Sequence, residues 1–209
     1  MNDTRKRRPT LQDIADLTGV TKMTVSRYLR DPSAVAEGTR ERIAAAVEEL
    51  GYIPNRAPDM LSNATSKAIG ILIPSLSNQV FSAVIHGIEA VTRPAGYQTL
   101  LAHYGYSPER EEEQVASLLS YNVDGLILSD TQHTERTRKM IATAGIPVVE
   151  TMDLPLSPID MVVGMDHRAA ARAMVTEMLR RGRRKVVYLG ARLDVRTQLR
   201  MEGYYQAMT

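Results

Sequence analysis

A group of basic, hydroxyl and thioether side chains near the N-terminus has the chemistry needed to contact nucleic acid. Lys22, Met23, Ser26 and Arg27 repeat at intervals of three and four, so one helix would present all four on the same side. Ammonium and guanidinium groups donate hydrogen bonds to guanine edges and phosphates, and hydroxyls can bond either. We therefore expect these four residues to contact the bases of DNA.

The stretch 10–30 predicts two short helices that would position this group. Thr10 with Asp13 resembles a capping box at the start of the first helix. Gly19 supplies a left-handed turn, and Thr21 caps the second helix. Such a pair suits insertion of the second helix into a DNA major groove. The spacing alone leaves open an ordinary solvated helix hairpin with a charged face.

The composition is that of a protein with one or two domains and real hydrophobic cores. The chain has 209 residues, 44% of them hydrophobic, and contains no cysteine, so it offers no disulfide and no thiolate metal ligand. No apolar run approaches the ~20 residues of a membrane span, and no signal peptide is visible. We expect a cytoplasmic, nucleoid-associated protein. The net charge is only +2, yet basic residues outnumber acidic ones within residues 1–30, as phosphate contact requires.

The rest of the chain changes from helices to alternating strands and helices. A third helix over 37–50 carries Ile43, Ala46, Val47 and Leu50 on one face and ends at Gly51. A helix over 79–93 is expected to pack through Val80, Val84, Ile88 and Val91. The alternation predicts a doubly wound parallel sheet. The expected strands are 68–74, 97–104, 123–129, 146–151, 161–166 and 185–190; the other expected helices begin near 107, 134, 166 and 196.

Several motifs resemble the DNA-binding head of the LacI/GalR family of bacterial repressors. They are T-L-x-D-I-A at 10–15, G-V-T at 19–21, T-V-S-R at 24–27, T-R-E-R-I at 39–43 and L-G-Y-I-P-N at 50–55. Residues 22–27 and 51–58 are most similar to the gluconate-utilisation branch. The resemblance implies an all-α helix-turn-helix head (1–53), then a hinge helix and linker (54–67). An α/β periplasmic-binding-protein-like core follows, with one lobe over 68–160 and an incomplete second lobe over 161–209.

The resemblance also implies how DNA is held, by a homodimer on a pseudo-palindromic operator. A hydroxyl common in the family at position 36 is replaced by Ala36, and Thr39 could partly substitute for it. A leucine matching Leu61 would wedge into the minor groove, unless it is an ordinary packed linker residue. The expected phosphate contacts are Arg7, Thr10, Thr21, Thr24, Thr39 and Asn55, and the expected minor-groove residues are Arg56, Ala57 and Leu61.

A small sugar acid, with gluconate as the candidate, is the effector that the resemblance implies. Ligands of such sheets bind at the carboxyl ends of strands, and a guanidinium binds a carboxylate in bidentate fashion. The expected effector residues are Ser75, Phe81, Asp130, Glu150 and Arg200. Each has a structural alternative: a core role for Phe81, a strand-end role for Asp130 and Glu150, and a solvated helix face for Arg200.

No enzymatic site is expected. The four histidines are scattered without metal-ligand spacing, and the sequence lacks a P-loop and a G-x-S-x-G elbow, so we expect no metal and no cofactor. Sugar kinases with a winged-helix head would need a phosphate-binding D-x-G-x-T motif, which is absent. The basic run at 180–185 brackets a glycine turn at a helix end, where positive charge complements the helix dipole.

Two functions therefore stay open. The first is a repressor that an effector releases from its operator. The second is a truncated fragment that does not sense and acts only through DNA binding or through mixed dimers with longer partners. Closure around an effector needs walls from two lobes, so the second hypothesis expects residues 161–209 to be loosely ordered and protease-sensitive.

Overall fold

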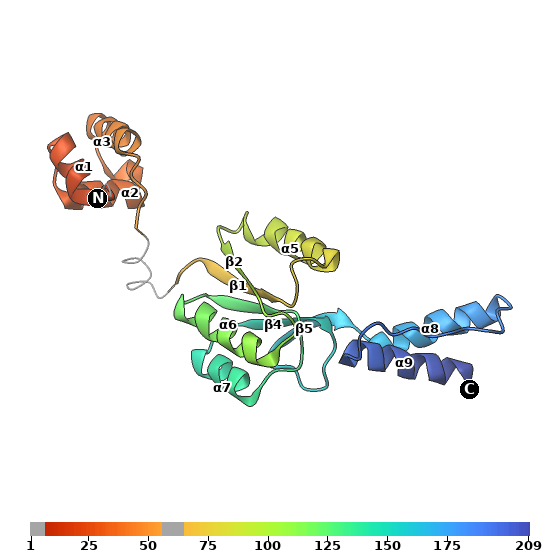
Figure 1. Cartoon of the computed structure of the whole chain (residues 1–209). Helices are drawn as coiled ribbons and strands as arrows, with labels where there is room; N and C mark the ends of the chain where they lie inside the picture. The colour runs from red at the N-terminus through yellow and green to blue at the C-terminus, as the bar shows by residue number, and fades with distance from the viewer. Residues whose placement is uncertain (1–6, 56–64) are drawn as a thin grey trace, which may run out of the picture. The chain divides into compact units, whose positions relative to one another are not determined.

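The computed structural model describes residues 7–55 and 65–209, and the chain divides into two compact units, Met1–Ser62 and Asn63–Thr209 (Figure 1). The boundary between the units falls inside the expected hinge and linker. The expected minor-groove residues Arg56, Ala57 and Leu61 lie outside the described residues. Within the described ranges, no helix is both long and apolar enough to cross a membrane.

Within residues 7–55, the first unit is a head of three α-helices. It comprises α1 (Leu11–Thr18), α2 (Lys22–Arg30), a 3-10 turn (Pro32–Ala34) and α3 (Glu37–Leu50). Thr10 and Asp13 form the expected capping box, and Gly19 ends α1 with a left-handed φ of 68°. Gly51 ends α3 in the same way, with φ 58°. The capping chemistry read from the sequence therefore sets the ends of these helices.

One small core holds the three helices together. Its fully buried side chains are Ile14 of α1, Val25 of α2 and Ile43 of α3, each with no exposed surface. Because Val25 faces inward, the residues around it on α2 are turned outward, and Met23 is 72% exposed. This packing fixes which side of α2 is available to a partner.

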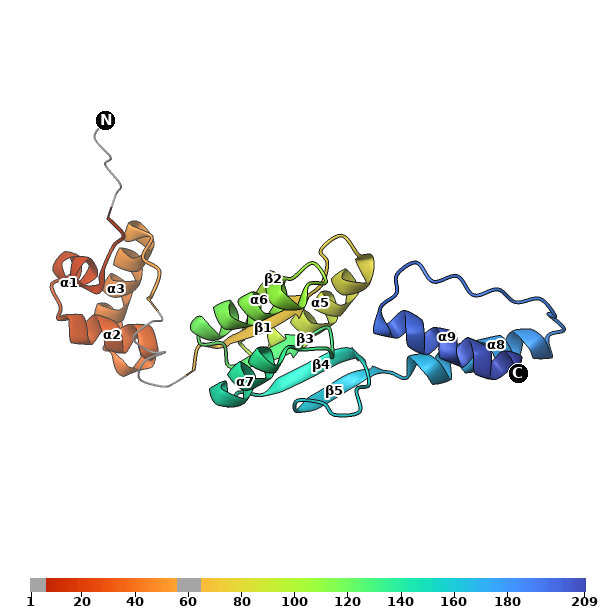
Figure 2. The same ribbon diagram turned by 60° about the horizontal axis from the view of Figure 1, so that its bottom comes forward.

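The second unit is a five-stranded, fully parallel sheet in the order β2-β1-β3-β4-β5 (Figure 2). The strands are β1 (Ala68–Ile73), β2 (Gln98–His103), β3 (Gly125–Leu128), β4 (Val148–Asp153) and β5 (Met161–Met165). Because β5 pairs with β4, the residues expected to open a second lobe at 161 begin with a strand of this same sheet. The strand expected at 185–190 does not form, and Val187 and Leu189 are almost fully exposed there.

Helices cover both faces of the sheet. On one face, α6 (Pro108–Ser120) and α7 (Glu135–Ala144) pack over Leu72, Leu126 and Leu128 (Figure 2). On the other face lies α5 (Gln79–Thr92), which packs through Phe81, Ile85 and Ile88 against the isoleucines of β1.

The inner face of α5 is only partly the one that the sequence predicted, because Ile88 packs against the sheet as expected but Val80 and Val91 do not. Val80 and Val91 are 48% and 72% exposed, so the expected valine stripe points mostly away from the sheet. The error comes from choosing between two overlapping apolar stripes on one helix. The larger Phe81 occupies the sheet side, and Val80 and Val91 are left outside.

The last two helices, α8 (His167–Arg180) and α9 (Val195–Met208), lie side by side beyond the end of β5 (Figures 1 and 2). They approach closely at Gly203, where an added Cβ would collide with the backbone carbonyl of Arg168. An ion pair of 2.6 Å joins Arg168 to Glu202 beside this contact. A glycine at this position is therefore a condition of the α8–α9 packing.

Candidate DNA interface and ligand pocket

The DNA-contact residues expected on α2 form one exposed face, which we call the recognition face: Lys22, Met23, Ser26 and Arg27. Lys22, Met23 and Arg27 are exposed, and Ser26 is partly buried beside Val25. The helix start is stabilised by Thr21, whose hydroxyl accepts a hydrogen bond from the Thr24 backbone N–H at 3.2 Å. The structure thus brings the four residues together at the solvent surface.

The residues expected to contact phosphate are held in local hydrogen bonds. Thr10 donates its hydroxyl to Asp13 at 2.7 Å, and Arg7 donates to the same carboxyl group at 2.6 Å. The hydrogen bonds from Thr10 and the nearby charge of Arg7 lower the pKa of Asp13. The hydroxyls of Thr21 and Thr24 are 3.0 Å apart.

Several of these groups border one surface hollow. It has a volume of ≈ 1040 Å³, and its lining includes Arg7, Arg8, Thr10, Lys22 and Asn55. Thr39, on α3, is not part of this lining, and its hydroxyl accepts a hydrogen bond from Arg42 at 3.3 Å. The positive charges of Arg7, Arg8 and Lys22 in this lining are suited to contact a phosphate backbone.

A second hollow, which we call the strand-end pocket, lies at the carboxyl ends of the parallel strands. It has a volume of ≈ 380 Å³. Its polar lining is formed by Tyr104, Glu111, Asp130, Gln132, Asp153, Arg192, Asp194, Arg196 and Gln198. Of the five residues expected to bind an effector, Asp130 lines this pocket.

The other four expected effector residues lie elsewhere. The hydroxyls of Ser75 and Ser77 are 3.0 Å apart, and Phe81 is 2% exposed in the core between α5 and β1. Glu150 is fully buried and accepts a hydrogen bond from the Ile159 backbone N–H at 2.6 Å. Arg200 donates to Nδ1 of His167 at 3.1 Å. None of these four is part of the strand-end pocket lining.

Two arginines that the sequence reading missed supply the positive charge of the strand-end pocket. Arg196 donates from Nε to both carboxylate oxygens of Asp153 at 2.8 Å and from a terminal nitrogen to the Ser129 carbonyl at 2.7 Å. The guanidinium of Arg192 lies 3.6 Å from the centre of the Tyr106 ring. Arg196 lies one helical turn before Arg200 on α9, and this spacing was the signal that could have revealed it. Arg192 precedes α9, and no spacing rule indicates it.

The acidic side of the pocket is anchored by hydrogen bonds. Tyr104 donates its hydroxyl to Asp130 at 3.1 Å, and burial, together with the charge of Asp130, raises the Tyr104 pKa, which keeps this donor protonated. Tyr106, which lines the pocket, and Met152, which precedes the lining residue Asp153, take left-handed φ values of 62° and 81°. Strained backbone of this kind gathers at ligand sites. Across the described ranges, no group of three or more His, Cys, Asp or Glu side chains is arranged to hold a metal ion.

The family follows from sequence comparison. Residues 10–55 match the model for bacterial regulatory proteins of the lacI family. Residues 66–209 match the model for periplasmic binding proteins and the sugar binding domain of the LacI family. The chain belongs to the LacI family. The helix-turn-helix head and parallel-sheet core expected from the resemblance are thereby confirmed.

Curated relatives in the LacI family are regulators. The chain is 61% identical over 204 residues to the HTH-type transcriptional regulator GntR of Escherichia coli strain K12, and 56% identical over 205 residues to IdnR of the same strain. Each match covers 98% of this chain but only 62% of the relative, so the chain spans about three fifths of their length. These relatives also confirm the expectation that the chain is not an enzyme.

Solved LacI-family structures share the fold. A LacI-family regulator from Silicibacter pomeroyi matches with a TM-score of 0.86 and 39% identity, over 96% of this chain and 61% of that one. The lac repressor dimer bound to operator and the anti-inducer ONPF matches with a TM-score of 0.83 and 27% identity, over 97% of this chain and 62% of that one.

Proposed function

We propose that this chain is a DNA-binding transcriptional repressor that acts in the cytoplasm. It binds a pseudo-palindromic operator as a homodimer, and a small sugar acid, with gluconate as the candidate, releases the DNA. The observation that carries the DNA-binding part is the recognition face on α2, within a head that matches the LacI family. An exposed helix bearing Lys and Arg and braced by a packed partner helix suits the major groove.

The strand-end pocket is lined by four carboxyl groups and two guanidinium groups, and the guanidinium groups are the feature that supports an acidic ligand that also carries hydroxyls. Arg192 offers its guanidinium group for a carboxylate, whereas Arg196 already bonds Asp153 and the Ser129 carbonyl. Asp130 and Gln132 offer hydrogen-bonding partners for hydroxyls. A sugar acid combines both kinds of group. The direct test is titration of the full chain with gluconate, and with glucose as the neutral control, while fluorescence anisotropy follows a labelled operator. We expect saturable gluconate binding that lowers the affinity for the operator. If gluconate and glucose lowered operator affinity equally, the assignment of an acidic ligand would be wrong.

One observation favours the second candidate, a DNA-binding chain that does not sense. The segment 185–190 finds no strand partner within the described part of the chain, and Val187 and Leu189 are 88% and 92% exposed. A pocket wall that rests on an unpaired segment has less support for closing on a ligand. The same titration separates the candidates, because this one predicts operator binding that gluconate does not change.

The outward stripe of α5 is the surface that we assign to the homodimer. Val80 and Val91 are exposed on α5, and Leu101 is 46% exposed on β2, the edge strand of the described sheet. An apolar helix face beside a sheet edge is typical of a surface covered by another protein. A second copy is the partner that a pseudo-palindromic operator requires.

We predict that Val91→Lys converts the dimer to a monomer. Val91 is 72% exposed, so the monomer loses little packing, and a lysine in the last turn of a helix complements its dipole. Sedimentation velocity is expected to show the monomer, and operator affinity should fall at least ~tenfold because each half-site then binds alone. Val187→Lys is the matched control, since Val187 is 88% exposed outside α5. If Val91→Lys stays dimeric, this surface is not the interface.

A further inference from the structure

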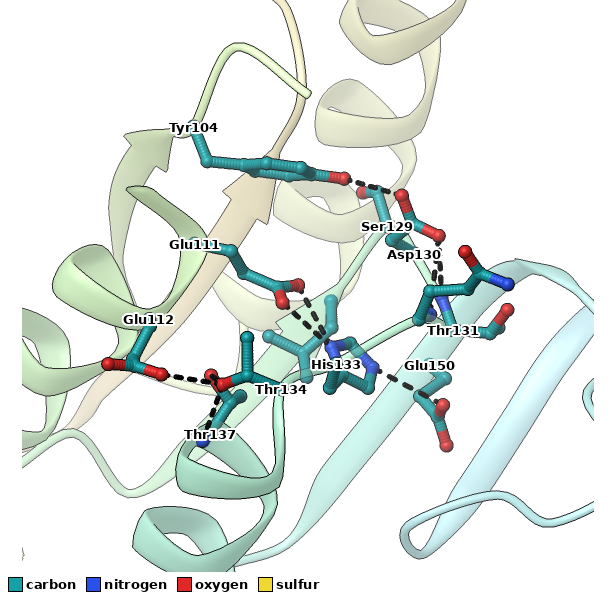
Figure 3. A network of polar contacts seen from close by, with 12 residues as sticks. Tyr104, Glu111, Glu112, Ser129, Asp130, Thr131, His133, Thr134, Thr137 and Glu150 are labelled. Atoms are coloured by element: carbon teal, nitrogen blue, oxygen red, sulfur yellow. Dashed lines mark hydrogen bonds and ion pairs between the residues drawn. The ribbon is translucent and has the colours of Figure 1, made fainter. Parts of the chain in front are cut away.

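A buried histidine links three elements beside the strand-end pocket, whose lining includes its partner Glu111 (Figure 3). The Nδ1 atom of His133 lies 2.9 and 3.0 Å from the two carboxylate oxygens of Glu111 on α6. Its Nε2 atom lies 3.4 Å from Oε1 of Glu150 on β4. The exposed fractions of the His133, Glu111 and Glu150 side chains are 0%, 2% and 0%. We call these three residues the His133 cluster.

The geometry of the His133 cluster requires a shared hydrogen. Glu150 uses Oε2 to accept the Ile159 N–H, so Oε1 faces His133 Nε2, and neither of these two atoms has another hydrogen-bond partner. A neutral ring that donates from Nδ1 to Glu111 has only a lone pair at Nε2. One proton must therefore lie between Nε2 and Oε1. Without it, two buried acceptors would face each other, which is costly in a dry site.

The charges around the ring favour keeping that proton. Burial lowers the pKa of His133, but the hydrogen bond and charge of Glu111 and the charge of Glu150 outweigh it, so the pKa lies above its ordinary value. The charge of Arg138 on α7 acts in the opposite direction. Because the pKa of His133 is raised in the folded protein, protonation of the His133 cluster stabilises the fold fully at acidic pH. This contribution to folding stability is lost as the pH rises through the pKa of His133 in the folded protein.

The loop that carries His133 also carries groups that form the strand-end pocket. Residues 129–134 connect β3 to α7, and Asp130 and Gln132 of this loop line the pocket. The Ser129 carbonyl accepts a hydrogen bond from Arg196, and Tyr104 donates to Asp130. The other end of the loop is held at Thr134, whose hydroxyl donates to Glu112 at 2.6 Å. Glu112 is in turn paired with Arg136 at 2.9 Å.

We propose that His133 is a positioning residue of the strand-end pocket, which holds Asp130 and Gln132 in place only while the His133 cluster keeps its shared proton. This inference rests on the proposed binding of a sugar acid in that pocket. Ligand binding orders the loop and so favours the protonated cluster. By linkage, the ligand and the proton then strengthen each other's binding.

The first measurement is the affinity of the full chain for gluconate as a function of pH. If gluconate binding raises the pKa of His133 by one unit, gluconate should bind about tenfold more weakly at pH values above the His133 titration than at pH values below it. Calorimetry in buffers of different ionisation enthalpy should detect proton uptake on binding within this pH range. A flat affinity profile without proton uptake, for a ligand that binds, would overturn the proposal.

Glu150→Gln is the decisive variant. The amide oxygen of glutamine can accept the Ile159 N–H, while its NH₂ group donates to Nε2 of a neutral His133. The hydrogen that the wild type takes from solvent is then covalently present, so gluconate binding should persist and lose its pH step. Glu113→Gln is the matched control, because Glu113 also lies on α6 but is exposed. The pH step should survive there, and its survival in Glu150→Gln would overturn the proposal.

A measurement without ligand separates this proposal from the proposed function. Hydrogen exchange of the 129–134 backbone, corrected for its intrinsic pH dependence, should accelerate above the titration in the wild type and stay slow in Glu150→Gln. If gluconate fails to bind at every pH but this contrast appears, the effector assignment is wrong and the positioning role stands. If the two proteins exchange alike at every pH, the positioning role is wrong.

Discussion

Arg27→Ala is expected to weaken binding to the cognate operator by about 1–3 kcal/mol and to relax the preference at one base pair per half-site. Arg27 is exposed on α2, two residues beyond the fully buried Val25, which fixes the face on which it lies. A guanidinium in this position can bond both acceptors of a guanine, and alanine can bond neither. Competition gel shifts with single-base operator variants measure the change in preference.

Arg7→Ala is the control that separates base reading from charge. Arg7 is exposed and pairs with Asp13 at the start of α1, beside the positive hollow of the head. Its loss should weaken binding to every sequence alike and reduce the salt dependence by roughly one phosphate contact. Unchanged base preference in Arg27→Ala, with a weaker salt dependence in both variants, would mean that α2 does not enter the major groove as proposed.

The head was predictable because its signals are local. Thr10, Asp13, Gly19 and Gly51 act within one helical turn of their own positions, and each cap forms as the sequence indicates. The alternation of strands and helices beyond residue 67 was equally clear, since buried parallel strands are short apolar runs. Local chemistry and periodicity therefore sufficed for the fold class.

Features that depend on distant partners were predicted less well. The inner face of α5 is decided by which side chains fit the isoleucines of β1, and two stripes on that helix are apolar. The run 185–190 has the composition of a buried strand, but a strand also needs a neighbour to bond, and no described strand lies beside it. Composition indicates what a segment can become, whereas pairing depends on the rest of the structure.

The strand-end pocket shows the same limit. Asp130 was found because it follows a strand directly, and Asp153 at the end of β4 obeys the same rule but was missed. Glu150 satisfied the sequence pattern for a pocket residue, yet its side chain points to His133 within the protein. The direction of a side chain near a strand end depends on which neighbours satisfy its charge, and His133 is distant in sequence.

Ile43→Ala is expected to unfold the head and abolish operator binding while the sheet unit stays folded. Ile43 of α3 has no exposed surface and packs in the core with Ile14 and Val25. Truncating such an isoleucine costs about 2–5 kcal/mol, because the removed methyl groups leave a cavity. A three-helix head has a small core and little stability to spare, so this loss is comparable to its whole free energy of unfolding.

Thermal unfolding of the full chain, followed by circular dichroism, tests this, because the head and the sheet unit are separate compact units. The unfolding transition of the helical head should disappear in Ile43→Ala, and the transition of the sheet unit should remain. Ile53→Ala removes the same atoms from a side chain that is 85% exposed, so its stability should stay within about 0.5 kcal/mol of the wild type. If the Ile43→Ala head unfolded at the same temperature as the wild-type head and still bound the operator, contacts other than this core would hold the three helices together.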